Sequence, residues 1–257
     1  MPGTTRKPIA AAKPRAAAKP VTPAKPETPA KPEKPAKPEK PAKPDKARKL
    51  GVRELSAQAT REAILRAATK VFAKHGYDGG RIEQISKLAK SHDRMIYYYF
   101  GSKEGLWVAV IEDTYRRFNE AEQLLALDTD KPAEALRAVI RFVWRYYQKN
   151  PEFITLLNTE NLHRGKYIAK SERAREYSSP VIAITDSVLR SGAEQGLFRT
   201  DLNARDVYLM IASMAYFYLS NRFTLSSFLG ENLEAPAALA HWEGFVVDAV
   251  QRTCASR

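Results

Sequence analysis

Cysteine is almost absent from this chain of 257 residues, which contains Cys254 alone. A single thiol cannot form a disulfide within the chain or build a zinc site that needs several cysteines. We therefore expect no disulfide framework and no cysteine metal centre. This cysteine usage favours a reducing cytoplasm.

Long apolar runs are also missing. No stretch approaches the ~18 apolar residues that a membrane-spanning helix needs, and lysine and proline, not an apolar block, open the sequence. We expect no membrane contact, no secretory signal and a cytoplasmic location. The alternation of apolar and polar residues typical of β-strands is lacking too, so we predict an all-α fold.

Positive charge is abundant but confined to one end. Residues 1–49 contain 14 Lys and Arg against 4 Asp and Glu, a net charge of +10, and residues 50–110 contain 10 against 6, a net of +4. Residues 111–257 contain 18 against 19, a net of −1. A polyanionic partner should therefore meet the amino-terminal end.

Residues 1–49 hold 12 of the 16 prolines and few large apolar side chains. They cannot bury enough surface to offset the entropy of ordering, so we predict a disordered tail. Lys-Pro recurs in it with a period of six residues, about 19 Å along a polyproline II strand. The tail is either a solvated spacer or a basic arm that adds non-specific phosphate contacts.

Residues 81–100 contain two short amphipathic helices separated by a polar corner. Ser91 or Asp93 can accept the free amides that open the second helix. This arrangement is typical of a helix-turn-helix, whose second helix lies in the DNA major groove. The apolar positions that define the two stripes are Ile82, Ile85 and Leu88 on the first helix, and Ile96 and Phe100 on the second.

The other helices are predicted from apolar spacing and from Gly and Pro boundaries. A scaffold helix runs over 56–76, and a helix that starts after Ser102 leads away from the helix-turn-helix and can transmit a tilt. A helix capped by Asn203 is apolar nearly all round, so a second subunit is needed to cover part of it. The remaining helices are expected at 132–150, 151–164, 177–195 and 236–252.

Residues 60–107 resemble the DNA-binding domain of TetR-family transcriptional regulators. The similarity lies in KVFAKHGYDGG, in RIEQISKLAKSHDRMIYYYF and in GSKEGLW, and the stretch from Tyr97 to Leu106 is its most specific part. The resemblance implies a ligand-responsive repressor that binds a palindromic double-stranded DNA operator as a homodimer. It further implies a helix-turn-helix domain at 54–114 and an effector and dimerisation domain at 115–257.

The resemblance also implies a set of DNA contacts. Tyr98, Tyr99 and Lys103 would contact phosphates, while Arg94 and its neighbours would face base edges. The family's corner usually reads Ala-Gly-Val-Ser, whereas this chain has Lys90 in place of the glycine, so the start of the recognition helix stays open. The expected DNA-binding residues are Arg81, Lys90, Ser91, His92, Asp93, Arg94, Met95, Tyr97, Tyr98, Tyr99 and Lys103.

In the family the last two helices form the dimer interface, which corresponds here to about 203–225 and 236–252. The carboxyl-terminal domain binds an effector, which is unknown for this chain. Candidates for its pocket are polar or aromatic residues on apolar helices, and the alternative for each is an ordinary core or interface role. These candidates are Trp144, Tyr147, Asn158, Asn161, His163, Tyr208 and Tyr216.

Three alternatives remain beside the repressor. The basic tail could make this an architectural protein that coats DNA, and the tyrosines at 97–99 could stack on single-stranded bases. Glu160 and His163 have the Glu-x-x-His spacing of di-iron helical bundles, but no second copy of the motif exists. No nucleophile, base and oxyanion group assemble, so we expect no enzyme, no cofactor and no metal site.

Overall fold

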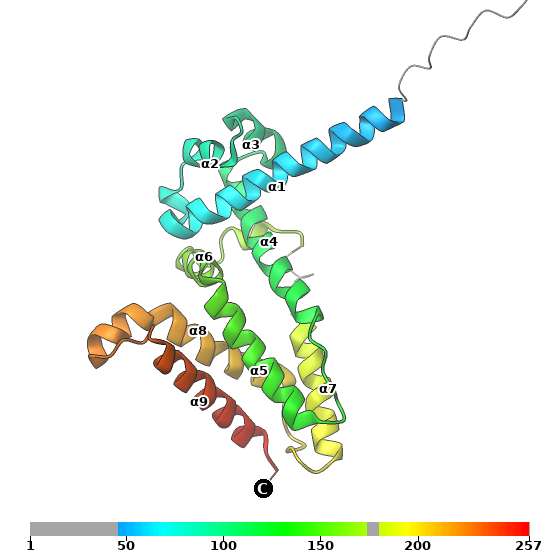
Figure 1. The fold of residues 1–257 in the computed structure, drawn as a ribbon, viewed down its shortest axis with the longest axis vertical. Coiled ribbons are helices and arrows are strands. Elements are labelled where there is room, and N and C mark those ends of the chain that lie inside the picture. Colours follow the sequence, from blue (N-terminus) through cyan, green and yellow to red (C-terminus); the bar gives the residue numbers. More distant parts are fainter. Residues whose placement is uncertain (1–45, 174–179, 257) are drawn as a thin grey trace, which may run out of the picture. The chain divides into compact units, whose positions relative to one another are not determined.

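A computed structural model describes residues 46–173 and 180–256, and Figure 1 shows their arrangement. The Lys-Pro repeat lies outside these residues. Within the described ranges the chain is helical, with an isolated antiparallel bridge between Phe198 and Ala255, so the all-α prediction is confirmed. No helix in this part of the chain is long and apolar enough to cross a membrane.

Helix α1 spans Lys46–Gly79 and begins ten residues before the predicted start at Ser56. Alanine, leucine, lysine and arginine after Pro44 favour helix, so residues 46–49 are helical and do not belong to the tail. The helix breaks at Gly76, whose φ of 67° suits a residue without Cβ, as the sequence predicted.

The helix-turn-helix consists of α2 (Ile82–Ala89) and α3 (Asp93–Phe100). The corner closes through backbone amides, because Lys90 N donates to Lys87 O and Ser91 N donates to Ser86 O. No side chain caps α3, so the expectation that Ser91 or Asp93 would do so is wrong. The side chains that join these helices to α1 and to the next helix are fully buried: Ile64, Phe72, Ile85, Ile96 and Trp107.

Two residues separate α3 from α4 (Lys103–Gln123), and the Ser102 side chain caps α4 by accepting from Gly105 N at 2.9 Å. The remaining helices follow close to the predicted bounds. They are α5 (Pro132–Lys149), α6 (Pro151–Leu162), the 3-10 turn η1 (Ile168–Lys170), α7 (Pro180–Glu194), α8 (Ala204–Leu229) and α9 (Pro236–Cys254).

Helix α5 is the centre of the carboxyl-terminal half, where it contacts α6, α7, α8 and α9 (Figure 1). Helix α8 buries one flank against these neighbours through Val207, Ile211 and Ala215. Its other flank exposes large apolar side chains. These side chains are Leu209, Phe217, Phe223, Phe228 and Leu229.

Candidate nucleic-acid interface and ligand cavity

The recognition helix α3 is held by one fully buried side chain, Ile96, and presents its other side to solvent. Tyr97 is 51% exposed and Tyr98 is 77% exposed, whereas Tyr99 and Met95 are partly buried. Rings held on a two-turn helix do not form the open, flat platform that stacking on single-stranded bases uses. A short helix with one buried and one exposed side is instead the arrangement that a helix-turn-helix uses to present its second helix to duplex DNA.

The corner between α2 and α3 forms a hollow that brings together residues expected to bind DNA. Ser91 is partly buried there, while His92, Asp93 and Arg94 are exposed. The hollow also contains Lys87, a cation in the last turn of α2 that sequence reasoning did not select. Its position in the sequence, one turn before the corner, could have identified Lys87 as a candidate DNA-binding residue. The lining is completed by Ser86.

Lys90 occupies the left-handed region, with φ 53° and ψ 43°, at the place where the family has glycine. The side chain is exposed and therefore points away from the core. Arg81, just before α2, is exposed as well. The left-handed turn survives without glycine because two backbone hydrogen bonds hold it.

Lys103 links the start of α4 to the end of α1. Its Nζ donates to Asp78 O at 3.2 Å and lies 4.9 Å from the centre of the Tyr77 ring. This position fixes an ammonium group next to the recognition helix, where a phosphate could approach it.

A cavity of about 450 Å³ lies between α4, α5, α6, α7 and α8. Aromatic and aliphatic side chains make up most of its wall. Three of the predicted effector residues, Tyr147, Tyr208 and Tyr216, line it. The other lining residues are Tyr115, Phe118, Asn119, Phe153, Leu157, Ile182, Leu209, Ala212 and Ser213.

The remaining four candidates do not line the cavity. Trp144 is buried core and packs edge-on against Tyr218 at 5.5 Å. Asn158 lies behind the wall, where it accepts from the Tyr216 hydroxyl and donates to Ser220 Oγ at 3.0 Å. Asn161 is exposed and donates to Leu157 O in its own helix. His163 lies next to Tyr77 and Tyr167, at the junction with α1.

Burial raises the pKa of several tyrosines in the wall. It raises the pKa of Tyr147 well above its usual value, and nearby Tyr208 adds to this effect. The pKa values of Tyr115 and Tyr216 are also raised, chiefly by burial. At neutral pH these hydroxyls are therefore uncharged and serve as hydrogen-bonding groups.

Sequence reasoning missed most of this wall because aromatic residues at helical spacing look alike in a solid core and around a cavity. Among the lining residues that were missed, Asn119 is the one that the sequence could have indicated. It is an amide beside Phe118 on α4, one turn before the fully buried Glu122. A polar side chain at such a position needs a reason that packing alone does not supply.

Glu160 and His163 make separate contacts in the structure. Glu160 is buried and accepts from Trp107 Nε1 at 2.6 Å and from the backbone amides of Tyr167 and Ile168 at 2.9 Å. Among the described residues, no group of three or more His, Cys, Asp or Glu side chains could hold a metal ion. Glu160 instead ties α6 to α4 and to the turn after α6.

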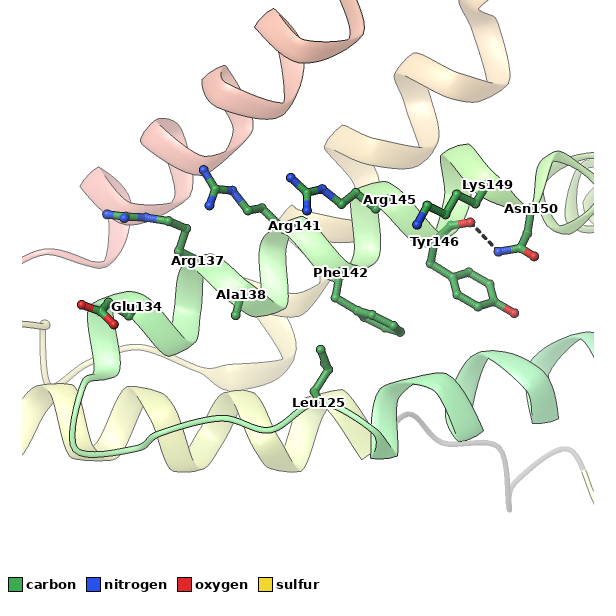
Figure 2. A pocket seen from close by; sticks show the side chains of 10 residues that line it. All are labelled: Leu125, Glu134, Arg137, Ala138, Arg141, Phe142, Arg145, Tyr146, Lys149 and Asn150. Atoms are coloured by element: carbon green, nitrogen blue, oxygen red, sulfur yellow. Dashed lines mark hydrogen bonds between the residues drawn. The ribbon is translucent and has the colours of Figure 1, made fainter.

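A second hollow follows the outer face of α5, and Figure 2 shows its cations at four-residue spacing. Arg141 and Arg145 bind Glu243 of α9 at 3.3 and 2.8 Å. Phe142, which lies beside these cations on α5, points towards Leu125. The ion pairs join α5 to α9, which makes this face a structural contact between the two helices. The cationic row is Arg137, Arg141, Arg145 and Lys149.

Comparison with known families assigns both halves of the chain. Residues 64–110 match the family described as bacterial regulatory proteins, tetR family. Residues 132–250 match the tetracyclin repressor-like, C-terminal domain.

Individual relatives extend this similarity over most of the chain. It is 52% identical over 205 residues to the HTH-type transcriptional repressor NicS of Pseudomonas putida, covering 80% of this chain and 97% of NicS. The HTH-type transcriptional repressor SCO4008 of Streptomyces coelicolor is 28% identical over 162 residues, covering 62% of this chain and 77% of that protein. The crystal structure of the transcriptional regulator FadR of Bacillus subtilis in complex with stearoyl-CoA shares the fold, with a TM-score of 0.54 at 20% identity. The match covers 75% of this chain and 98% of the FadR chain.

Proposed function

Because the chain belongs to the TetR family of DNA-binding transcriptional regulators, we propose that it is a ligand-responsive repressor acting as a homodimer on a palindromic operator. The observation that carries this proposal is the outward side of α3, which is held by one buried isoleucine and displays polar and aromatic side chains. In a twofold dimer the two copies of α3 enter successive major grooves about one helical turn apart.

The proposed contacts divide into two kinds. His92, Asp93, Arg94 and Met95 stand at the start of α3, the part of a recognition helix that reaches base edges. Arginine can read guanine with two hydrogen bonds. The phosphate contacts come from cations and hydroxyls around that centre, which position the helix without reading sequence. These are Arg81, Lys90, Ser91, Tyr97, Tyr98, Tyr99 and Lys103.

Two alanine variants test this division on operators with each base pair changed in turn. Arg94→Ala should relax discrimination at one operator position by about 1–3 kcal/mol. Lys103→Ala should weaken binding to every sequence about equally. Binding is measured by fluorescence anisotropy at two salt concentrations.

Lys149→Ala provides the control, because this exposed lysine lies on α5 among the cations of Figure 2. Its operator affinity should equal that of the wild type. Equal and uniform losses for Arg94→Ala and Lys103→Ala would remove the assignment of Arg94 to a base.

The exposed flank of α8 supports the proposed dimer. Phe217 and Phe223 on α8 are 58% and 60% exposed, and Phe245 on α9 is 49% exposed. A second copy of the same surface would cover these rings, since a twofold interface pairs a patch with itself. The interface would then run through about 203–225 and 236–252, as the family implies.

The aromatic cavity supports a ligand response. Helix α4 contributes Tyr115, Phe118 and Asn119 to the cavity wall, and only two residues separate it from the recognition helix. A ligand that binds better to one orientation of α4 shifts the dimer towards that orientation by its differential affinity. We propose that the favoured orientation fits the operator poorly, so that the ligand releases the repressor.

A further inference from the structure

We propose that the cavity takes a flat aromatic ligand that donates a hydrogen bond to Asn119 Oδ1. This inference rests on the proposed function, because it names the chemical class of the effector and the residue that selects it. Three observations support it: the aromatic wall of the cavity, the hydrogen-bond partners of the other polar side chains in the wall, and the lack of a partner for Asn119 Oδ1 among the described residues.

The wall favours a flat ring. Six aromatic side chains line the cavity, and some of them already pack on one another. Phe118 and Phe153 lie 5.4 Å apart between ring centres, and Tyr115 meets Phe153 edge-on at 5.7 Å. A planar ligand can continue this pattern of offset and edge contacts, whereas a branched aliphatic compound cannot.

Most polar side chains of the wall already have partners. Tyr147 and Tyr208 interact with each other, and Tyr208 contributes to the raised pKa of Tyr147. The Tyr216 hydroxyl donates to Asn158 Oδ1, and Ser213 Oγ donates to Met210 O at 2.9 Å. These groups gain little by bonding to a ligand, so they do not select for its polar substituents.

Asn119 differs from them. Its Oδ1 and Thr185 Oγ1 are the buried side-chain oxygens that have no hydrogen-bond partner among the described residues. Of the two residues, Asn119 lines the cavity and Thr185 does not. A buried acceptor without a partner lowers stability. In this proposal the Asn119 amide turns towards the cavity, where a ligand N–H or O–H donates to Oδ1 and recovers that loss.

The described part of the wall contains no charged side chain. Ring packing, the tyrosine hydroxyls and Asn119 Oδ1 therefore remain for recognition, and Asn119 Oδ1 is the buried acceptor among them without a partner in the described structure. A ring with a donor in its plane, such as a lactam N–H, can use both the ring packing and this acceptor.

Two matched probes isolate this hydrogen bond. 2-Pyridone has a flat ring with an N–H donor, and N-methyl-2-pyridone has the same ring with the donor blocked. Their dissociation constants for the full chain are measured by ligand-observed NMR. The wild type should prefer 2-pyridone by about tenfold, the ratio expected for one buried hydrogen bond.

Asn119→Leu keeps the size of the side chain and removes the acceptor, so the preference should fall to less than about twofold. Asn119→Ser, whose hydroxyl is too short to reach the same point, should show the same loss without added apolar bulk. Asn232→Leu, an exposed position in the loop between α8 and α9, should retain the tenfold ratio. Circular dichroism checks that each variant is folded.

The proposal is overturned if the wild type binds neither probe or binds both equally, or if folded Asn119→Leu keeps the preference. Operator binding by the same samples separates this result from the proposed function. If the wild type binds the operator but shows no preference between the probes, the ligand proposal is wrong and the proposed function stands. Loss of specific operator binding by the wild type would remove the proposed function itself.

Discussion

Glu160 is one of the residues that join α6 to the DNA-binding half of the chain. Trp107 Nε1 and the amides of Tyr167 and Ile168 donate to its two carboxylate oxygens. A buried carboxylate that accepts three hydrogen bonds has its charge offset by those donors. The same residue on a free helix surface would contribute little to stability.

Glu160→Gln should lower the free energy of unfolding by about 1–3 kcal/mol, because glutamine places an NH₂ group against one of the three donors. Urea denaturation followed by Trp fluorescence and by circular dichroism measures the change. Glu152→Gln is the control on the same helix, since the Glu152 side chain makes no hydrogen bond among the described residues. Equal stabilities of wild type and Glu160→Gln would show that the three contacts do not hold the junction.

The two residues of the Glu-x-x-His motif show what sequence can predict at this scale. Their spacing placed Glu160 and His163 on one face of a helix, and the missing second copy argued against a metal. The partners of Glu160 lie 53 and 7 positions away, at Trp107 and Tyr167. No local pattern encodes those contacts, so the role of Glu160 became visible only in the fold.

At the scale of elements, the corner between α2 and α3 holds a lysine in a conformation that side chains with a Cβ rarely adopt. Lys90→Gly should raise the free energy of unfolding by about 0.5–1 kcal/mol, because relief of the left-handed strain exceeds the added entropy of the unfolded chain. Thermal and urea denaturation measure the effect.

Lys87→Gly gives the matched comparison inside α2, where glycine should lower the free energy of unfolding by about 1 kcal/mol. A destabilised Lys90→Gly variant would mean that the lysine side chain makes a compensating interaction at the corner. Weaker operator binding by a stabilised Lys90→Gly variant is the expected result of removing a cation that binds a phosphate.

Helices with strong boundary residues were predicted well. Pro132, Pro151 and Pro236 open α5, α6 and α9, and Gly76 interrupts α1 as predicted. The start of α1 was wrong by ten residues because the apolar stripe begins late, while helix propensity alone continues to Lys46. The caps expected at α3 were wrong because His92 occupies the N-cap position and the Met95 amide donates to the His92 carbonyl oxygen.

At the scale of the whole molecule, the exposed phenylalanines of α8 predict self-association. Phe217→Glu should raise the dimer dissociation constant at least about thirtyfold, since a charge would be buried at the centre of the interface. Sedimentation velocity measures the fraction of dimer over a range of concentrations. Specific operator affinity should fall together with that fraction.

Leu124→Glu is the control, because Leu124 is 85% exposed at the end of α4, outside the proposed interface. This variant should remain a dimer. A wild type that sediments as a monomer, or a folded Phe217→Glu variant that dimerises as the wild type does, would exclude the proposed interface.

The basic tail gives a prediction that separates the repressor from an architectural protein. Removal of residues 1–44, just before α1, should make DNA binding less sensitive to salt. The slope of the logarithm of the binding constant against the logarithm of the salt concentration should become shallower by about 0.9 for each phosphate that the tail neutralises in the full chain. Discrimination between operator and random DNA should stay unchanged. Loss of all DNA binding on truncation would favour the architectural alternative.

The family was predictable because its signature is contiguous, running through the helix-turn-helix into α4. The ligand cavity was only partly predictable. Tyr147, Tyr208 and Tyr216 were selected from their types, but the wall joins five helices whose facing sides depend on tertiary packing. The ion pairs of Arg141 and Arg145 were not anticipated either, since their partner Glu243 belongs to a distant helix.

Helix α4 is unbroken over 21 residues, roughly 31 Å, from the cap at Ser102 to the turn beyond Asn119. In the proposed repressor this helix acts as a lever arm. A pivot of about 6° at its cavity end displaces the other end by about 3 Å, close to the rise of one base pair. On that proposal, a compound that shifts Asn119 by a fraction of an ångström moves the two copies of α3 away from the spacing of successive major grooves.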